Sequence, residues 1–343
     1  MSRDTKIEWC DHTFNPWEGC SKISPGCAHC YAAARNARFG GGTASNWGPG
    51  APRRRTSKHN WQEPLRWNLA ARAGARRPRV FCASLADWLD DEVPADWLAD
   101  LIELIEATPH LDWLLLTKRP ENWRPRLSAI VAENSSPGRK LTHVAAVCSA
   151  WLSRQPPSNV WIGTTVEDQD RAQERIWRLL SIPATVRFLS CEPLLGPVDL
   201  LAGAFDPPNS GFAIMDGFGR VDDDEVGIHW VICGGESGPC ARPMHPSWAR
   251  SLRDQCRAAG VPFFFKQWGA WVPFYDSAIQ PGAAPMLGKK ERWLSLAGEA
   301  EFNGHGTVAV RRVGKKAAGR FLDLRQWSEF PVSASSVVKT AHP

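Results

Sequence analysis

Three cysteines stand close together near the start of this 343-residue chain. Cys20, Cys27 and Cys30 fall within eleven residues, and the Pro25-Gly26 pair predicts a turn directly before Cys27. The two-residue gap between Cys27 and Cys30 lets both sulfurs face one point. Thiolates grouped in this way are typical ligands of a zinc ion or an iron–sulfur cluster. The sequence therefore predicts a metal centre in this loop.

The spacing alone leaves the kind of metal centre open. A structural zinc ion needs a fourth protein ligand, for which Cys10, His12 and His29 are the candidates. A [4Fe–4S] cluster held by three cysteines instead leaves one iron open to a substrate or a cofactor. The polar N-terminus carries no hydrophobic signal segment, so we expect a cytoplasmic protein. In that compartment, ten cysteines favour metal binding or catalysis over disulfide bonds.

Further candidates follow short apolar runs that recur six times, at 80–83, 113–116, 160–163, 186–189, 230–233 and 262–265. The polar residues at the ends of these runs include Ser84, Asp87, Lys118, Arg119, Thr164, Glu167, Cys191, Glu192, Gly234, Gly235, Glu236, Lys266 and Gln267. Stretches with helical periodicity separate several of the runs, at 94–107, 168–180 and 246–259. This alternation is typical of a parallel sheet with crossover helices, which gathers functional groups at the carboxyl ends of its strands.

The sequence thus predicts an α/β fold, a complete or partial (β/α) barrel, over residues 1–269, with a first strand near 12–14. From about residue 270 to 343 the alternation stops, and we expect a small C-terminal appendage there. The segment 304–310 favours a hairpin in this appendage. The basic residues of the appendage are candidates for closing over the barrel or for contacting phosphate, and they include Arg311, Arg312, Lys315 and Lys316.

Charge is unevenly distributed, although the net charge is only +5. Residues 35–79 carry eleven Lys or Arg and one acid, whereas residues 80–112 carry nine acids and no Lys or Arg. The basic stretch predicts an insertion that binds nucleic acid, through phosphate contacts of Arg53, Arg54 and Arg55 and base stacking on Trp61. Its glycine and proline clusters also fit a solvated loop, so both interpretations stay open.

The overall composition excludes several classes of protein. No apolar run approaches the roughly 18 residues of a membrane helix, so we expect no membrane partner. The abundant aromatic residues exclude a disordered chain. The 18 tryptophans include six near the cysteine loop, in the basic stretch or after the last apolar run, where they could stack on a ligand. These six are Trp17, Trp47, Trp61, Trp67, Trp268 and Trp271.

Several motifs together resemble the phage and prophage three-Cys-motif proteins, a family of divergent radical S-adenosylmethionine (radical SAM) enzymes. The motifs are NPWEGC at 15–20, SPGCAHCY at 24–31, LTKRP at 116–120, FLSCEPL at 188–194, GGESG at 234–238, FFKQWG at 264–269 and GRFLD at 319–323. Six residues separate Cys20 from Cys27, where the radical SAM superfamily usually has three. The resemblance implies a radical SAM type of barrel.

The resemblance also implies the cofactors and the chemistry. Cys20, Cys27 and Cys30 would hold a [4Fe–4S] cluster, and an electron donor such as flavodoxin or ferredoxin would drive cleavage of S-adenosylmethionine to a 5′-deoxyadenosyl radical. The implied substrate is DNA, a nucleotide or a nucleobase. The most specific expectation is an isomerase that moves an amino-acid substituent of thymine from a nitrogen link to a carbon link during hypermodification of phage DNA, in the host cytoplasm.

Position at the strand ends suggests roles for the remaining candidates. We expect Cys191, Glu192 and Lys266 to act in catalysis, with Cys191 as a hydrogen donor or simply a core thiol. The expected cofactor-binding residues are Ser84, Lys118, Arg119, Thr164, Glu167, Gly234, Gly235 and Glu236. Two alternatives remain: a zinc-stabilised nucleic-acid-binding protein, and a radical SAM lyase that repairs damaged pyrimidines.

Overall fold

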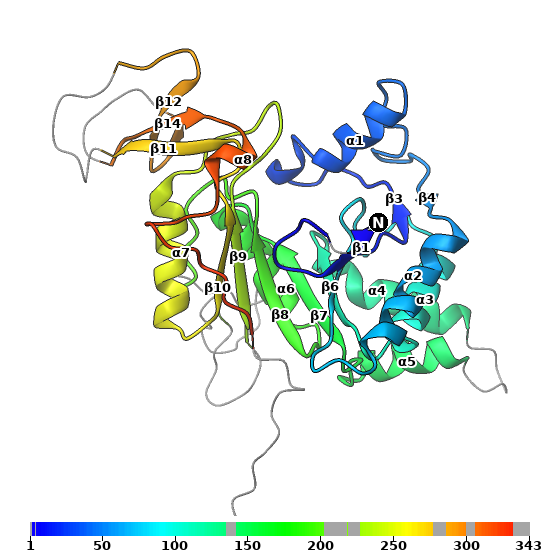
Figure 1. Cartoon of the computed structure of the whole chain (residues 1–343). Coiled ribbons are helices and arrows are strands. Elements are labelled where there is room, and N and C mark those ends of the chain that lie inside the picture. The colour runs from blue at the N-terminus through cyan, green and yellow to red at the C-terminus, as the bar shows by residue number, and fades with distance from the viewer. Residues whose placement is uncertain are drawn as a thin grey trace, which may run out of the picture.

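The computed structural model of the chain describes residues 2–3, 5–134, 142–201, 218, 227–276, 286–299 and 306–331. The strands of its main sheet are β1 (Ser2–Arg3), β2 (His12–Thr13), β5 (Arg79–Cys82), β6 (Asp112–Thr117), β7 (Val160–Thr165), β8 (Val186–Cys191), β9 (Trp230–Gly234) and β10 (Phe263–Gln267). They lie in the order β1-β2-β5-β6-β7-β8-β9-β10, all parallel except β1. The seven parallel strands curl into a half barrel (Figure 1), which confirms the α/β class and a partial barrel.

Side chains alternate between the two faces of this sheet, because successive residues of a strand point in opposite directions. The concave face is filled by a cluster of large apolar residues, with Trp9 and Cys10 of the N-terminal segment packed into it. The strand residues of this cluster are Phe81, Leu114, Trp161, Val186, Phe188, Trp230, Ile232 and Phe264. Their partners of opposite parity face the convex side, where they pack with the helices in a second cluster.

The helices beside this convex side are α3 (Ala95–Glu106), α4 (Trp123–Glu133), α5 (His143–Leu152), α6 (Gln169–Leu180) and α7 (Pro246–Ala258). The periodicity predicts three of them, α3, α6 and α7. Asp168 caps α6 by accepting a hydrogen bond from the backbone N–H of Arg171 at 2.9 Å, and Thr142 caps α5 in the same way. Short 3₁₀ turns, η1 (Pro25–Cys27) and η2 (Pro120–Asn122), precede α1 (Tyr31–Phe39) and α4.

The basic stretch is an ordered part of the fold. It contains the strand β4 (Arg54–Arg55), which pairs with β3 (Trp17–Glu18), and the helix α2 (Lys58–Ala71), which buries Trp67 against the ring of His12. Its arginines form ion pairs with the neighbouring acidic stretch, namely Arg53–Asp90 at 2.7 Å, Arg53–Glu92 at 3.3 Å, Arg55–Asp100 at 2.5 Å and Arg77–Asp112 at 3.6 Å. Three cations of the basic stretch, Arg53, Arg55 and Arg77, thus pair with acids of the following stretch, so part of the charge separation in the sequence is an internal interface.

This arrangement corrects the expected nucleic-acid role of Arg53. Its side chain is 1% exposed and is bonded to Asp90, to Ser21 and to two backbone carbonyls, so it has no face left for a phosphate. The guanidinium of Arg55 covers the ring of Trp61, 4.5 Å from its centroid, which blocks that face for base stacking. Arg54 is more exposed and pairs with Glu18.

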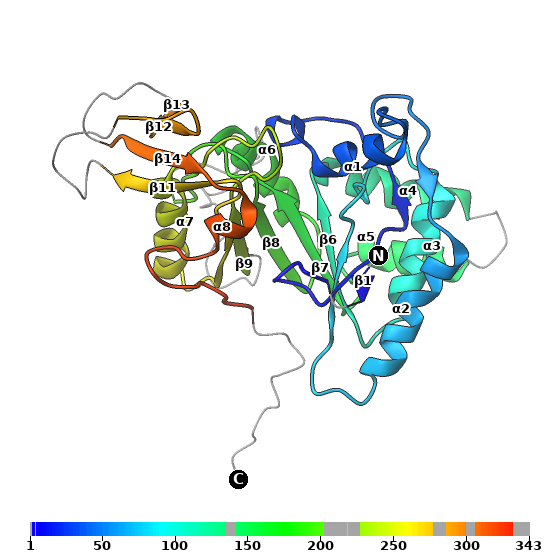
Figure 2. The same ribbon diagram turned by 45° about the horizontal axis from the view of Figure 1, so that its top comes forward.

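The C-terminal appendage is a four-stranded antiparallel sheet in the order β11-β14-β12-β13, rather than a single hairpin. Its elements are β11 (Trp271–Asp276), β12 (Glu291–Ser295), β13 (Gly298–Glu299), β14 (Val308–Arg312) and the short helix α8 (Lys315–Ala318). This sheet and α1 flank the same end of the half barrel (Figures 1 and 2). Two separate parts of the chain thus border the mouth at which the parallel strands end.

Asp112 at the start of β6 provides a pH-dependent prediction. Burial raises its pKa from 3.8 to about 6, although the nearby Arg77 opposes this shift. The folded chain therefore binds this proton more tightly than the unfolded chain, so the free energy of unfolding falls as the pH rises from about 4 to about 6. We expect Asp112→Asn to be more stable than the wild type at neutral pH and equally stable at acid pH. Urea unfolding at acid and at neutral pH measures the difference in stability between Asp112→Asn and the wild type. A difference that is the same at both pH values contradicts the prediction.

Candidate functional site

A cavity of about 520 Å³ opens at the carboxyl ends of the parallel strands. All three cysteines of the N-terminal loop line it. The strand-end residues that line it are Ser84, Asp87, Thr117, Lys118, Thr165, Ser190, Glu192, Gly235, Glu236, Lys266 and Gln267. The prediction that the polar ends of the strands converge with the cysteine loop is therefore confirmed, because parallel strands end at one edge of their sheet.

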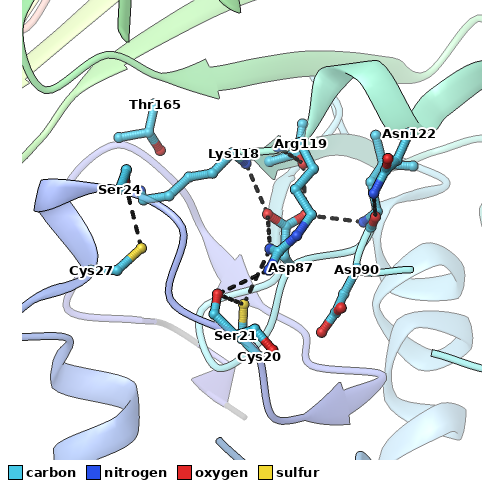
Figure 3. Close-up of polar contacts among 12 residues, drawn as sticks. Cys20, Ser21, Ser24, Cys27, Asp87, Asp90, Lys118, Arg119, Asn122 and Thr165 are labelled. Carbon is cyan, nitrogen blue, oxygen red and sulfur yellow. Dashed lines mark hydrogen bonds and ion pairs between the residues drawn. The ribbon is translucent and has the colours of Figure 1, made fainter. Parts of the chain in front are cut away.

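One end of the cysteine loop is bonded to Arg119, which follows β6 (Figure 3). The Arg119 guanidinium donates to the Cys20 sulfur at 3.4 Å and to the backbone carbonyl of Ser21 at 2.9 Å. Asp87 orients Arg119 from the end of β5, with an oxygen 3.3 Å from Nη1, and it also accepts a hydrogen bond from Thr117. Burial opposes the charge of Arg119, but Asp87 and Cys20 outweigh it and raise the Arg119 pKa. Arg119 thus anchors the loop.

The middle of the loop is fastened to Glu167, which follows β7 and is fully buried. Ser24 donates to Oε1 of Glu167 at 2.5 Å, and Arg175 of α6 donates to Oε2 at 3.0 Å. The Lys118 amine lies 3.7 Å from the same carboxylate. A Cβ at Gly26 would lie 2.5 Å from Oε1 of Glu167, so only glycine allows the loop to approach this closely.

A third anchor lies at the end of β9. Arg242 donates two side-chain hydrogen bonds to Glu236, at 2.6 and 2.9 Å, and a third to the backbone carbonyl of Pro25 at 3.0 Å. His29 contacts the same Glu236 carboxylate through Nδ1 at 3.2 Å. Burial would raise the Glu236 pKa, but the hydrogen bonds from Arg242 outweigh it and lower the pKa. Three strand ends therefore hold one loop.

The other predicted residues divide between the cavity and the core. Ser84 lines the cavity and accepts a hydrogen bond from Asn15 at 3.0 Å, whereas Thr164 is buried and donates to the backbone carbonyl of Thr117. Gly234 leaves room for the Glu192 side chain, because a Cβ there would lie 3.3 Å from Oε1. Gly235 lines the cavity and packs against the Trp268 backbone.

Cys191 does not face the cavity. It points to the convex, helix-covered side, where it belongs to the same apolar cluster as Cys233 and Cys256. The alternation along β8 explains this placement, because Ser190 and Glu192 on either side of it both line the cavity. Burial raises the pKa of the Cys191 thiol, which keeps it protonated. The arrangement corrects its expected role as hydrogen donor in favour of a core thiol.

The cysteine sulfurs share the cavity but not one coordination point. No group of three or more His, Cys, Asp or Glu side chains in the described ranges is arranged to hold a metal ion. Cys20 contacts Arg119, and Cys27 lies 3.6 Å from the Ser24 hydroxyl (Figure 3). Burial raises the pKa of Cys20 to about 12.

The three candidates for a fourth zinc ligand lie apart from this loop or are already engaged. The ring of His12 stacks on Trp67, Cys10 lies in the concave core, and His29 contacts Glu236.

Comparison with known proteins gives a family. The family described as "Protein of unknown function (DUF5131)" matches residues 4–331. The chain belongs to the DUF5131 family. Neither the curated proteins nor the solved structures gave a match. Within the described ranges, no helix of this DUF5131 chain has the length and apolar character needed to span a membrane.

Two residues that hold the cysteine loop, Ser24 and Arg242, have no role in the sequence prediction, whereas Asp87 belongs to the polar cluster predicted after the run 80–83. Asp87, Arg242 and Ser24 hold the cysteine loop through side-chain contacts. Ser24 sits within the loop motif and Asp87 just after a strand, so their sequence positions are compatible with a role in the site. Arg242 follows no apolar run, and only its contacts reveal its role. Of the six tryptophans expected near a ligand, Trp47 lines the cavity, whereas Trp17, Trp67, Trp268 and Trp271 are buried in apolar clusters.

Proposed function

We propose that this chain is a radical SAM enzyme that acts on the base of a nucleotide or of DNA. One observation carries the proposal: three cysteines of a single loop line the same cavity as the polar ends of six parallel strands. A reactive centre bound to such a loop would face a substrate held by those strand ends. The finer expectation, rearrangement of a modified thymine, stays a prediction.

The three cysteines suit an iron–sulfur cluster, both because thiolates bind iron and because the cysteines line an open cavity. Cys20, Cys27 and Cys30 supply three thiols on one side of a cavity with room for a second ligand. Their sulfurs are not gathered in this conformation, so binding requires the loop between Cys20 and Cys30 to draw them together and release their protons. When bound, a cluster of this kind supplies one-electron cleavage of S-adenosylmethionine to give a radical that abstracts hydrogen.

The residues of the chain itself then have positioning tasks. Glu167, Arg119 and Arg242 hold the loop over the strand ends, which keeps its thiols at the cavity while they draw together. Glu192 and Lys266 form an ion pair of 2.7 Å that lines the cavity and supplies charged groups for a polar ligand. The apolar wall formed by Trp9, Phe81 and Leu116 limits access of water to that side of the cavity.

Anaerobic purification and reconstitution with iron and sulfide test the proposal. We expect about four irons per chain, visible absorbance of a cluster, and release of 5′-deoxyadenosine when S-adenosylmethionine and a reductant are added. A variant with Cys20, Cys27 and Cys30 all changed to alanine should lose all three signals, and a Cys240→Ala variant, changed at an exposed cysteine, should keep them. Stoichiometric zinc without iron in the wild type overturns the proposal and favours the zinc alternative.

The C-terminal appendage offers the surface for a phosphate backbone. Lys315 lines the cavity and is exposed, as is its neighbour Lys316 on α8. Lys289, Lys290 and Arg292 are exposed on the same appendage. Of these cations Lys315 lies at the cavity, whereas Arg53 and Arg55 of the basic stretch are tied to acids.

We expect Lys315→Ala/Lys316→Ala to weaken binding of a short DNA duplex and to reduce the slope of log affinity against log salt by about 2, one for each lost phosphate contact. The paired control is Lys58→Ala/Arg72→Ala, which removes two exposed charges from the basic stretch. Fluorescence anisotropy over a salt series measures both variants. If the control weakens binding and the α8 variant does not, the basic stretch is the DNA surface.

A further inference from the structure

Two consecutive residues of β10 reach the same carboxylate. Lys266 donates to Oε2 of Glu192 at 2.7 Å, and the Gln267 side-chain amide donates to Oε1 at 3.2 Å. Successive side chains of a regular strand point to opposite faces, but the pairing of β10 with β9 shifts register between Phe265 and Gln267. This irregularity brings both side chains to the cavity side.

Gln267 is left with an acceptor that has no partner. The side chain lines the cavity, the residue is only 4% exposed, and its Oε1 forms no hydrogen bond in the described part of the chain. Glu192 fixes the amide orientation, because a carboxylate accepts from the NH₂ group and repels the carbonyl oxygen. A buried carbonyl without a donor costs free energy, so the site requires a donor from a ligand or from water.

The neighbouring Lys266 adds the complementary group. Its ammonium has three N–H donors, and Glu192 uses one of them. Lys266 and Gln267, both bonded to Glu192, therefore supply one cavity with a donor and an acceptor. The ligand edge that matches this pair carries a carbonyl next to an N–H. The rings of Trp9, Tyr31 and Phe81 also line the cavity, which suits a planar ligand.

We infer that Lys266 and Gln267 form a recognition site for the lactam or imide edge of a nucleobase, as in thymine or guanine. Gln267 Oε1 has almost no accessible surface in the described structure, so its amide turns toward the cavity to accept the ring N–H, while Lys266 donates to the adjacent carbonyl and Glu192 holds Lys266. The inference rests on the proposed function for a nucleobase as substrate, and it adds which edge of the base the chain reads. An aliphatic amine or a phosphate satisfies only one of the two groups.

Calorimetric titration of the full-length protein with two pairs of nucleosides tests this inference. The pairs are thymidine with N3-methylthymidine, and guanosine with N1-methylguanosine. In at least one pair the unmethylated nucleoside should bind about tenfold more tightly or better, because methylation removes the N–H that Gln267 accepts. Equal affinities within both pairs, or no binding of any of the four, overturn the inference and leave water as the partner of Gln267.

Two variants separate recognition from a structural role. Gln267→Met keeps the volume, removes the unpaired acceptor and should abolish the preference for the unmethylated nucleoside. Lys266→Met should weaken both members of a pair while keeping their ratio. A preference that survives in Gln267→Met overturns the assignment, and the wild-type ratio still decides if that variant does not fold. Release of 5′-deoxyadenosine without substrate is measured separately, so failure of the cluster chemistry is distinguishable from failure of base recognition.

Discussion

Replacing Glu167 with alanine is expected to lower the free energy of unfolding by about 3–5 kcal/mol. The Glu167 carboxylate is fully buried and pairs with Arg175, whose side chain is only 2% exposed. Among the described residues, the Arg175 guanidinium without Glu167 keeps only the backbone carbonyl of Thr165 as a hydrogen-bond partner. The large expected effect follows from this uncompensated charge, because truncating one member of a buried ion pair leaves the other without its counter-charge.

Urea unfolding followed by circular dichroism measures this loss. Glu174→Ala on α6, next to Arg175, is the matched control, because its carboxylate is half exposed and its ion pairs with Arg171 and Arg178 are superficial. We expect the control to change the free energy of unfolding by less than about 1 kcal/mol. Similar losses of unfolding free energy in Glu167→Ala and Glu174→Ala would show that Glu167 does not compensate the buried charge of Arg175.

Asp90→Ala is the second substitution with a large expected effect, again about 3–5 kcal/mol. The Asp90 side chain is fully buried and lies 2.7 Å from Nε of Arg53, which is itself 1% exposed. Glu92 lies 3.3 Å from Arg53 but is partly exposed, so it compensates the charge only in part. Asp90→Ala therefore leaves the buried guanidinium of Arg53 without its main counter-charge, where the basic stretch packs against the barrel.

Chemical denaturation of Asp90→Ala beside Asp91→Ala measures this effect, since Asp91 is exposed and next in the chain. The same pair of variants tests the role of Arg53. If Arg53 served nucleic acid rather than the fold, Asp90→Ala would free its charge, strengthen DNA binding and cost little stability. We expect the opposite, a large loss of stability with no gain in DNA affinity.

Much of the architecture follows from local pattern. The six apolar runs become β5 to β10, and the helical periods at 94–107, 168–180 and 246–259 become α3, α6 and α7. These elements are predictable because burial of alternate or every third to fourth residue depends on near neighbours in the chain. The appendage is less predictable, since β11 and β12 find their shared partner β14 through pairing across long sequence separations.

The sequence by itself determined that the cysteine loop and the strand ends meet at one cavity, because a loop near the first strand and the ends of parallel strands must share one edge of the sheet. Only the tertiary structure decided what each residue does there. The alternation of side chains along β8 places Cys191 in the core. A register shift in β10 places Gln267 on the cavity side.

The tertiary structure also decided how the charges pair and which tryptophans are buried. Residues 35–79 and 80–112 display opposite charge in the sequence, but their pairing into buried contacts such as Arg53–Asp90 depends on which side chains the fold brings within bonding distance. Of the tryptophans, Trp17 and Trp67 became core residues, while Trp47 remained at the cavity. Composition records the presence of a side chain, whereas its partner and exposure are properties of the packed chain.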